Sequence, residues 1–385
     1  MEQGKIREEE EARAAKKKAD DSRAKYDYWM ANLPKLGRKT IYPLMDYFGN
    51  AYNLYHASWA ELSKCPVLSQ QKAEQILRSR ESWDLQGRWE TFQKRGIQFV
   101  TYGMEGYPRR LKKVEDAPYW LYIRGHLPQE DKVSVAIVGA RGCSEYGRKM
   151  AMDLGRILSE ADVEVISGLA YGIDTYGHMG VLQAGGPGQT YAVLGCGVDI
   201  CYPASNRKLY QQIRETGGIL SEYAPGKEPH PGRFPERNRI ISGLADVVVI
   251  VEAREKSGSL ITADCALEQG RDVYAIPGRV TDVLSMGCNR LIQQGAGILL
   301  SPQNLLEELK LFREKSQEFP INSKIGLEKD ELLLYSCFDI LQPKGLEELI
   351  QDSGMGVVEI MTMLMKLQAK GCIREVFKNS YIRCN

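Results

Sequence analysis

The sequence predicts an α/β fold in which a doubly wound, mostly parallel sheet follows a small helical unit and precedes another small unit. Strand-like runs alternate with helical patterns between residues 97 and 300, and this order produces parallel strands joined by crossover helices. The runs are continuously rich in Val and Ile, as in strands that are buried on both faces. The 385 residues are also enough for two or three domains.

The strand-like runs place the sheet in one large domain over 89–305. We expect about six to eight of them to be strands, with helices between them. The runs are 97–103, 134–140, 163–169, 190–195, 218–223, 246–253, 272–278 and 297–300.

The region before the sheet divides into a charged tail over 1–25 and a helical domain over 26–88. The tail is a solvated run of charges to which we assign no function. The helical domain shows two short helix pairs in tandem, similar to SAM-like or helix-hairpin-helix modules, whose turns hold a DNA phosphate on backbone N–H groups. Gly37 fits such a turn, but Ser69 stands in the second one. A purely structural packing domain is the favoured interpretation.

The region after the sheet is expected to contain a linker over 306–326 and a last unit over 327–385. Three helical patterns followed by two short strands give this unit the order of a winged helix. Its third helix carries Glu359, while Lys366 and Lys370 come only at its end. A helix that reads the major groove needs Arg, Asn or Gln, so we favour a protein-contact role.

Composition excludes several classes of protein. No apolar run reaches the roughly 18 residues of a membrane span, and the charged N-terminal segment lacks the apolar core of a secretory signal; we therefore expect a cytoplasmic protein. The nine cysteines show no C-x-x-C spacing, which predicts reduced thiols and no metal site. A net charge of +1 argues against a basic coat protein but not against a local basic groove.

A glycine-rich turn, 139–147, follows the strand that ends at Val138. It lacks the Rossmann dinucleotide fingerprint, because Arg141 stands where a second glycine would meet the pyrophosphate. It also lacks the P-loop, because Arg148 and Lys149 replace the Lys-Ser/Thr pair. What remains is a helix N-terminus with one arginine, which favours a phosphate. We therefore expect no nucleotide cofactor.

Other strand ends carry similar groups. Ser167-Gly168 and Lys256-Ser257-Gly258 each follow a strand and precede a helix, and the loop 227–239 combines several cations with Phe234. Cations that track phosphates and an aromatic ring that stacks a base are typical of single-stranded nucleic-acid sites. The candidate binding residues are Gly139, Arg141, Ser144, Ser167, Gly168, Arg207, Arg233, Phe234, Arg237, Asn238, Arg239, Lys256, Ser257 and Gly258.

Together these motifs resemble the DprA/Smf family of bacterial DNA-processing proteins, and they run in family order over about 130–300. The matching segments are Val138-Gly139-Ala140-Arg141 with Ser144; 167–174; 194–199 with Tyr202-Pro203 and Asn206; 234–241; 256–263; and 275–278 with Gly287 and Asn289. The SAM-like and winged-helix units also match the family's architecture around an extended Rossmann-like domain.

The resemblance implies a non-enzymatic, homodimeric protein that binds single-stranded DNA, protects incoming strands during natural transformation and loads the recombinase RecA onto them. The family's DNA pocket carries over to Arg141 and to the set Phe234, Arg237, Asn238 and Arg239. Two positions depart from the family pattern. Ala140 replaces a serine, and Ala204 stands where some relatives have a lysine, so that Arg207 or Lys208 is the alternative cation.

Two other functions stay open at this point. Nucleoside-monophosphate phosphoribohydrolases share the sheet type, and Thr262 with Glu268 would be the candidate catalytic pair. The Gly-rich string expected before that threonine is absent, and no convergent acid–base pair is visible, so no catalytic residues are expected. A receptor for a small nucleotide, with the winged helix as its output, is the third possibility.

Overall fold

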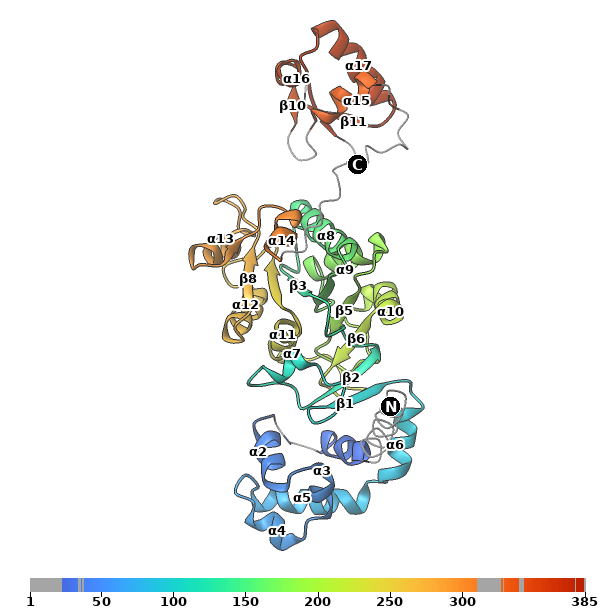
Figure 1. The fold of residues 1–385 in the computed structure, drawn as a ribbon, viewed down its shortest axis with the longest axis vertical. Helices are drawn as coiled ribbons and strands as arrows, with labels where there is room; N and C mark the ends of the chain where they lie inside the picture. Colours follow the sequence, from blue (N-terminus) through green and yellow to red (C-terminus); the bar gives the residue numbers. More distant parts are fainter. Residues whose placement is uncertain are drawn as a thin grey trace, which may run out of the picture. The chain divides into compact units, whose positions relative to one another are not determined.

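The computed structural model describes residues 23–33, 36, 38–309, 327, 329–338, 343–377 and 379–383. They belong to two compact units, Met1–Phe312 and Arg313–Asn385 (Figure 1). Gly37, almost all of the charged tail and most of the linker expected at 306–326 lie outside the described residues.

The first unit is built on a nine-stranded sheet with the order β1-β2-β6-β5-β4-β3-β7-β8-β9. From β6 to β9 all neighbouring strands are parallel, which confirms the α/β prediction of a large, mostly parallel sheet. The strands are β1 (Gln98–Thr101), β2 (Trp120–Gly125), β3 (Ser134–Val138), β4 (Glu164–Ser167), β5 (Thr190–Val193), β6 (Gly218–Ser221), β7 (Val247–Ile250), β8 (Asp272–Ala275) and β9 (Gly297–Ile298).

Each expected run contains one of these strands, but β2 was not expected. It pairs antiparallel with both β1 and β6, and a loop containing the short helix α7 (Arg109–Lys112) separates it from β1. A hairpin is recognised from a tight turn between its strands, and this long connection has none. The pairing of β2 was therefore not predictable from a turn, but the run Trp120-Leu121-Tyr122-Ile123 before Gly125 is rich in strand-favouring residues, and this local signal was missed.

Helices cover both faces of the sheet because successive strand residues point in opposite directions. Val135 and Ile137 of β3 pack with α8 (Glu145–Glu160), α9 (Ile173–Ala184) and α14 (Pro302–Glu308). Ala136 and Val138 pack on the other face with α11 (Arg233–Leu244), α12 (Gly258–Glu268) and α13 (Met286–Gln293). The remaining helix, α10 (Arg207–Thr216), follows the short 3₁₀ turn η1 (Ala204–Asn206) and packs near β5 and β6.

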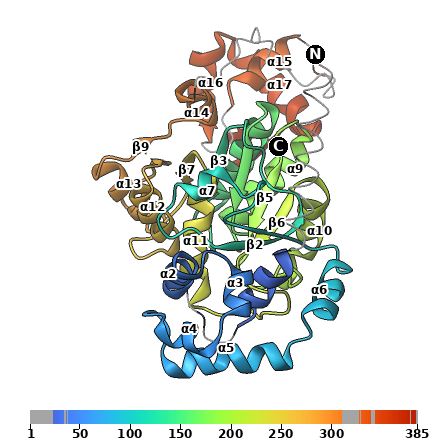
Figure 2. The same cartoon turned by 60° about the horizontal axis from the view of Figure 1, so that its bottom comes forward.

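The N-terminal helices form their own core and also contact the sheet edge. They are a helix over 23–31, α2 (Arg38–Phe48), α3 (Ala51–His56), α4 (Trp59–Lys64), α5 (Gln70–Ser82) and α6 (Leu85–Gln93). Trp29, Leu44, Leu54 and Leu62 are fully buried among them, and Trp120 of β2 packs against the same cluster. Figure 2 shows these helices beside β2.

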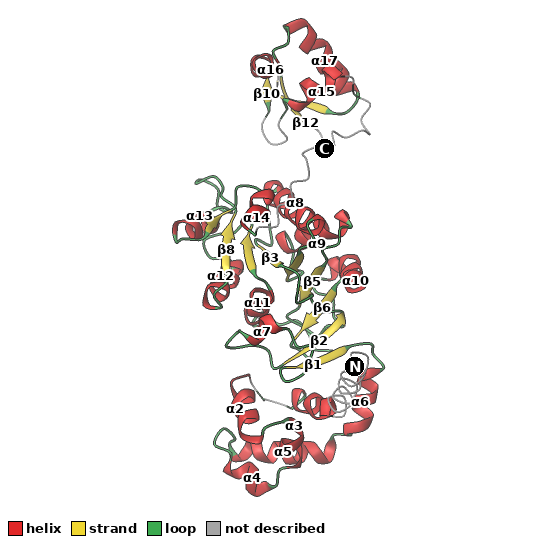
Figure 3. Ribbon diagram, viewed as in Figure 1, coloured by secondary structure: helices red, strands yellow, loops and turns green. Residues whose placement is uncertain are grey.

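The second unit has the element order α15 (Lys329–Ser336), β10 (Lys344–Gly345), α16 (Leu346–Ser353), α17 (Val357–Ala369), β11 (Ile373–Phe377) and β12 (Ser380–Arg383). The three strands form a sheet in the order β10-β12-β11, with antiparallel pairs (Figure 3). Leu334, Leu349, Ile360, Leu364 and Leu367 form its core. The expected three helices and two final strands are present, and β10 is an addition.

Candidate nucleic-acid interface

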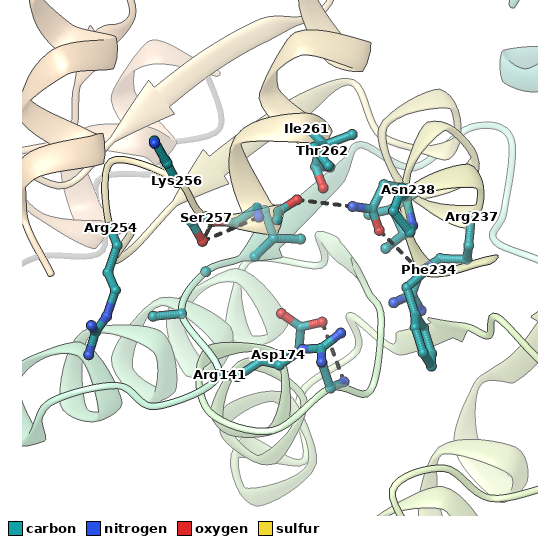
Figure 4. A pocket seen from close by; sticks show the side chains of 18 of the residues that line it. Arg141, Asp174, Phe234, Arg237, Asn238, Arg254, Lys256, Ser257, Ile261 and Thr262 are labelled. Carbon is teal, nitrogen blue, oxygen red and sulfur yellow. Dashed lines mark hydrogen bonds between the residues drawn. The ribbon is translucent and has the colours of Figure 1, made fainter. Parts of the chain in front are cut away.

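A pocket of about 580 Å³ opens where the strand order of the main sheet reverses. The chain winds from β3 outward to β6 and then returns to place β7 on the other side of β3. In open α/β sheets, the crevice beyond the carboxyl ends of two such strands is where ligands bind. The pocket is lined from 138–142 after β3, from the first turns of α11, and from 254–262 after β7, with Ala170, Asp174 and Tyr202 (Figure 4).

Glu252 ties together the two turns that form this crevice. Its carboxylate, on a residue only 2 % exposed, accepts hydrogen bonds from the Ser144 backbone N–H at 2.9 Å and from the Ser144 hydroxyl at 2.5 Å. The Ser144 Oγ also accepts from Gly147 N–H and caps α8, and Ala140 N–H donates to the Glu252 carbonyl. Ser144 therefore holds the glycine-rich turn in place and does not line the pocket.

An aromatic pair and an arginine form one side of the pocket. The Phe234 ring stacks on the Tyr202 ring with centroids 5.4 Å apart and planes inclined by 26°. The Arg141 guanidinium carbon lies 5.4 Å from the centroid of the Phe234 ring. Gly195 makes room for that ring, because a Cβ there would lie 2.9 Å from Phe234 Cδ1. Flat π-surfaces and a cation are thus combined within one cavity.

The opposite side is cationic and includes a helix N-terminus. Arg254 and Lys256 line it, next to Ser257, which precedes the first residue of α12. The Asn238 amide donates to the Gly258 carbonyl at 3.2 Å and so links α11 to the start of α12. The Ser257 side chain and carbonyl accept from the N–H groups of Ser259 and Leu260, and the dipole of the 11-residue helix favours an anion at this end of the pocket.

The floor is organised by Arg237, which is 4 % exposed. Its Nη1 donates to the carbonyls of Gly168, at 2.8 Å, and Val193, which fastens α11 to the ends of β4 and β5. The Asp174 carboxylate accepts from the N–H groups of Gly168 and Ala170, and burial raises the pKa of Asp174. Asp174 is the one carboxylate among the described residues that line the pocket; Figure 4 shows it beside Arg141.

Several predicted residues lie outside the pocket lining. Ser167 is fully buried and donates to the Ile137 carbonyl at 2.6 Å. Arg239 is 4 % exposed and pairs with Glu222 and Asp116 at 2.5 and 3.2 Å, because residues two positions apart on a helix point in different directions. The predicted residues in the lining are Gly139, Arg141, Phe234, Arg237, Asn238, Lys256, Ser257 and Gly258.

Arg207 and Arg233 also lie outside the lining but closer to the protein surface. Arg207 is exposed at the start of α10. The Arg233 guanidinium donates to the Glu228 carbonyl and lies 5.1 Å from the Tyr223 ring centroid. Gly168 is not in the lining either, but a Cβ there would lie 2.6 Å from Arg237 Nη2. Because Gly168 has no side chain, it leaves the space that the Arg237 guanidinium occupies.

The candidate binding residues chosen from the sequence did not include Tyr202, Asp174 or Arg254, which all line the pocket. Arg254 lies four residues beyond the end of β7, so the rule that ligands bind beyond strand ends could have identified it. Of the proposed enzymatic pair, Thr262 lines the pocket, but Glu268 is exposed at the far end of α12. Within the described ranges, no group of three or more His, Cys, Asp or Glu residues could hold a metal ion, and no helix could cross a bilayer.

Comparisons with known proteins agree with this architecture. Residues 98–310 match the family DNA recombination-mediator protein A. The DNA processing protein DprA of Streptococcus pneumoniae is 46% identical over 204 residues, which are 53% of this chain and 71% of that protein. Protein Smf of Escherichia coli is 36% identical over 286 residues, which are 72% of this chain and 75% of that protein.

Two solved structures are similar as well. The crystal structure of S. pneumoniae DprA has a TM-score of 0.64 and 36% identity and covers 74% of this chain and 97% of its own. DNA processing protein A of Helicobacter pylori, described for its single-stranded DNA binding mode, has a TM-score of 0.50 and 32% identity, with 55% and 96% coverage. The chain therefore belongs to the DNA recombination-mediator protein A family, whose members are called DprA or Smf.

Proposed function

We propose that the chain binds single-stranded DNA in the pocket between β3 and β7. The observation that carries the proposal is the Arg141–Phe234–Tyr202 group, in which a guanidinium lies over one ring and a second ring stacks beside it. Base stacking on aromatic rings combined with cations that contact phosphates is how proteins bind single strands without sequence preference. The name of the H. pylori relative, which refers to single-stranded DNA, supports the same assignment.

The geometry favours a single strand over a duplex. A base in a duplex already stacks on its neighbours and pairs with its complement, so it has no free face for Phe234. An unpaired base can stack there while its phosphates lie near Lys256 and the N-terminus of α12, which line the same pocket. Outside the pocket, Arg207 and Arg233 are proposed to contact the phosphates of flanking nucleotides. We assign Ser144, Ser167, Gly168 and Arg239 to positioning the site.

The direct test is equilibrium binding of the full chain to fluorescent oligo-dT and to duplexes of the same length. We expect binding to oligo-dT that strengthens with length and weakens steeply with salt, because each neutralised phosphate releases counterions. Protection of the oligonucleotide from a nuclease should follow the same salt dependence. Equal affinity for duplexes, or no binding of oligo-dT, would contradict the proposal.

We further propose that the protein is not an enzyme. Thr262 lies in the pocket, but Glu268 does not line it, so the phosphoribohydrolase pair does not converge on one substrate. Incubation with AMP and detection of free adenine tests this directly. Release of adenine that is abolished by Glu268→Ala would contradict the proposal that the protein is not an enzyme. Binding of a small nucleotide in calorimetry, without binding of DNA, would favour the receptor function.

RecA loading is proposed on the basis of family membership. The measurement is RecA-dependent ATP hydrolysis on oligo-dT that has been coated with a single-strand-binding protein. The chain should shorten the lag before hydrolysis begins, and a variant that no longer binds DNA should not. Such a protein acts where the chromosome lies, so we place it in the cytoplasm.

A homodimer through the extended Rossmann domain is also proposed. Exposed apolar side chains follow β8 and lie around α13, among them Val280, Val283 and Met286, which are 85%, 53% and 42% exposed. A group of exposed apolar residues often marks a protein interface. Sedimentation of the full chain should give a dimer mass, and Val280→Glu should reduce it to that of a monomer.

The two smaller units are proposed to be a SAM-like domain over 26–88 and a winged helix over 327–385. The first proposal is supported by the compact helical core around Trp29 and Leu54. The second is supported by the order α15-β10-α16-α17-β11-β12, in which three helices are followed by a two-stranded wing.

A further inference from the structure

The C-terminal unit carries an uncovered apolar stripe on the outer side of α17. The inner side of this helix packs Ile360, Leu364 and Leu367 into the core of the unit. On the outer side, Val358 and Met365 are 80% and 70% exposed. A helix at a protein surface normally presents charged or polar residues on the face opposite its core, so this stripe is unusual.

The stripe continues along almost the whole helix. Met361, Thr362 and Ala369 are also exposed, and together with Val358 and Met365 they follow the i, i+3/i+4, i+7 spacing that places residues on one helix face. None of them is charged. Methyl and thioether groups give this face little capacity to contact phosphates or base edges, so it fits a protein surface.

One acidic and one basic residue beside the stripe are placed so that a second α17 running in the opposite direction would bring an opposite charge to each of them. Glu359 and Lys366 are seven residues apart, which places them on the same flank. Glu359 Oε2 accepts a hydrogen bond from Gly356 N–H at 3.1 Å, which leaves the other carboxylate oxygen available. Lys366 is exposed, and no ion pair links it to any of the described residues.

We propose that α17 pairs in antiparallel orientation with α17 of a second copy of this chain, about a two-fold axis near Thr362. This axis is perpendicular to both helices, so the flank that carries Glu359 and Lys366 in one copy lies next to the same flank of the other copy. Glu359 of each copy then lies beside Lys366 of the other, which gives two equivalent ion pairs. Val358 packs against Met365 of the second copy, and both stripes are removed from water.

The contact is small. One helix face buries less than the roughly 1,200 Å² that stable interfaces bury in total. It is therefore weak between free chains and stronger when another interface holds the two copies together, because the second contact is then intramolecular. The proposal depends neither on DNA binding nor on the site of any other dimer contact.

Cysteine cross-linking of the full chain tests both the contact and its register. Thr362→Cys places two thiols next to the axis, within the Cα separation of about 4.4–6.8 Å that a disulfide requires. Lys366→Cys places them roughly 10 Å apart along the helices. Under mild oxidation, we expect covalent dimers from T362C above the background that the native cysteines give in the unaltered chain. K366C alone should not form them.

A second variant removes the apolar contact without disturbing the core. Met365→Glu changes an exposed side chain, so the unit should fold, and in the T362C chain it should reduce cross-linking to background. On dilution, the rate of T362C cross-linking falls if α17 is the main contact and is unchanged if another interface joins the copies; both results support the pairing. Cross-linking of T362C no greater than background, or equally strong linking of K366C alone, would overturn it.

Discussion

The Arg237 guanidinium occupies the space that a side chain on residue 168 would need. A Cβ on Gly168 would lie 2.6 Å from Arg237 Nη2, and the same guanidinium donates to the Gly168 carbonyl. One buried arginine thus joins α11 to the end of β4 and supports the floor of the pocket. The glycine is required for packing, although its backbone conformation is accessible to other residues.

This relationship predicts that Gly168→Ala lowers the free energy of unfolding by ~1–3 kcal/mol, because the displaced guanidinium loses buried hydrogen bonds. Thermal denaturation measures the effect. The matched control is Gly142→Ala, where a Cβ would have no neighbour within 4 Å. Equal melting temperatures for the two variants would show that Arg237 does not need the space at residue 168.

Phe234→Leu should weaken oligo-dT binding by ~1–3 kcal/mol, the value of stacking one base on an aromatic ring. Leucine keeps an apolar side chain above Gly195 but has no π-face. Because no charge is removed, the dependence of affinity on salt should stay the same. Fluorescence anisotropy across a salt series measures both quantities. Tyr47→Ala, which changes an exposed ring on α2, should leave the affinity unaltered.

Arg141→Ala should weaken binding about 5- to 30-fold, or ~1–2 kcal/mol. The slope of log affinity against log salt should also fall by about 0.7, as expected for one lost phosphate contact on a single strand. Arg141→Lys should keep the slope but not the contact of a planar guanidinium with Phe234. Arg148→Ala on α8 removes a charge outside the pocket lining and is the control. A salt slope that Arg141→Ala leaves unchanged would exclude a phosphate contact.

Ser144→Ala removes both the cap of α8 and the hydroxyl bonded to Glu252. We expect a loss of ~1–2 kcal/mol in stability together with weaker DNA binding, because the turn that carries Arg141 is no longer fixed. Ser69→Ala, which removes only the cap of α5, should reduce stability without changing DNA binding. If both variants bound DNA like the unaltered chain, the turn would not depend on the Ser144–Glu252 contact.

His178 predicts a dependence of stability on pH. The Thr190 hydroxyl donates to the Val165 carbonyl, so His178 Nδ1–H must donate to the Thr190 oxygen, 2.6 Å away. The buried Nε2 has no hydrogen-bond partner among the described residues, and burial lowers the pKa of His178 to about 3. Protonation of the folded protein would bury an uncompensated charge.

The sign of the effect follows from proton uptake. An unfolded histidine titrates near pH 6.5, so below that pH the unfolded chain binds a proton that the folded chain does not. The stabilisation is complete above pH 6.5 and is lost as the pH falls toward 3, by about 1.4 kcal/mol per pH unit. His178→Gln should remove this slope, measured by urea unfolding at several pH values. An identical slope in the variant would contradict the assignment.

The unaltered chain and the His178→Gln variant have to be compared because Glu164 acts in the opposite direction. Burial raises the pKa of Glu164 to about 7, so its contribution to stability is lost as the pH rises from about 4.5 to 7. Glu164 is present in both proteins, and the difference between their pH profiles isolates His178.

The sequence by itself determined the fold class and predicted the edge of the sheet at which the pocket opens. Continuous Val and Ile runs are a local property that indicates buried parallel strands, and glycine-rich turns at their ends mark the edge where a ligand binds. Arg141 was identified as a cation in a glycine-rich turn at a helix N-terminus, and Phe234 as an aromatic ring among the cations of the loop 227–239. The scarcity of cations along α17 is likewise a property of the sequence.

Only the tertiary structure decided which of the candidate residues face the pocket. Arg237 and Arg239 are two positions apart and chemically identical, yet one supports the pocket floor and the other pairs with Glu222 away from it. Tyr202 and Phe234 are distant in sequence, and their stacking depends on how the loop between β5 and η1 lies against α11. Side-chain direction and long-range proximity are set by packing between elements, and a local pattern contains no information about either.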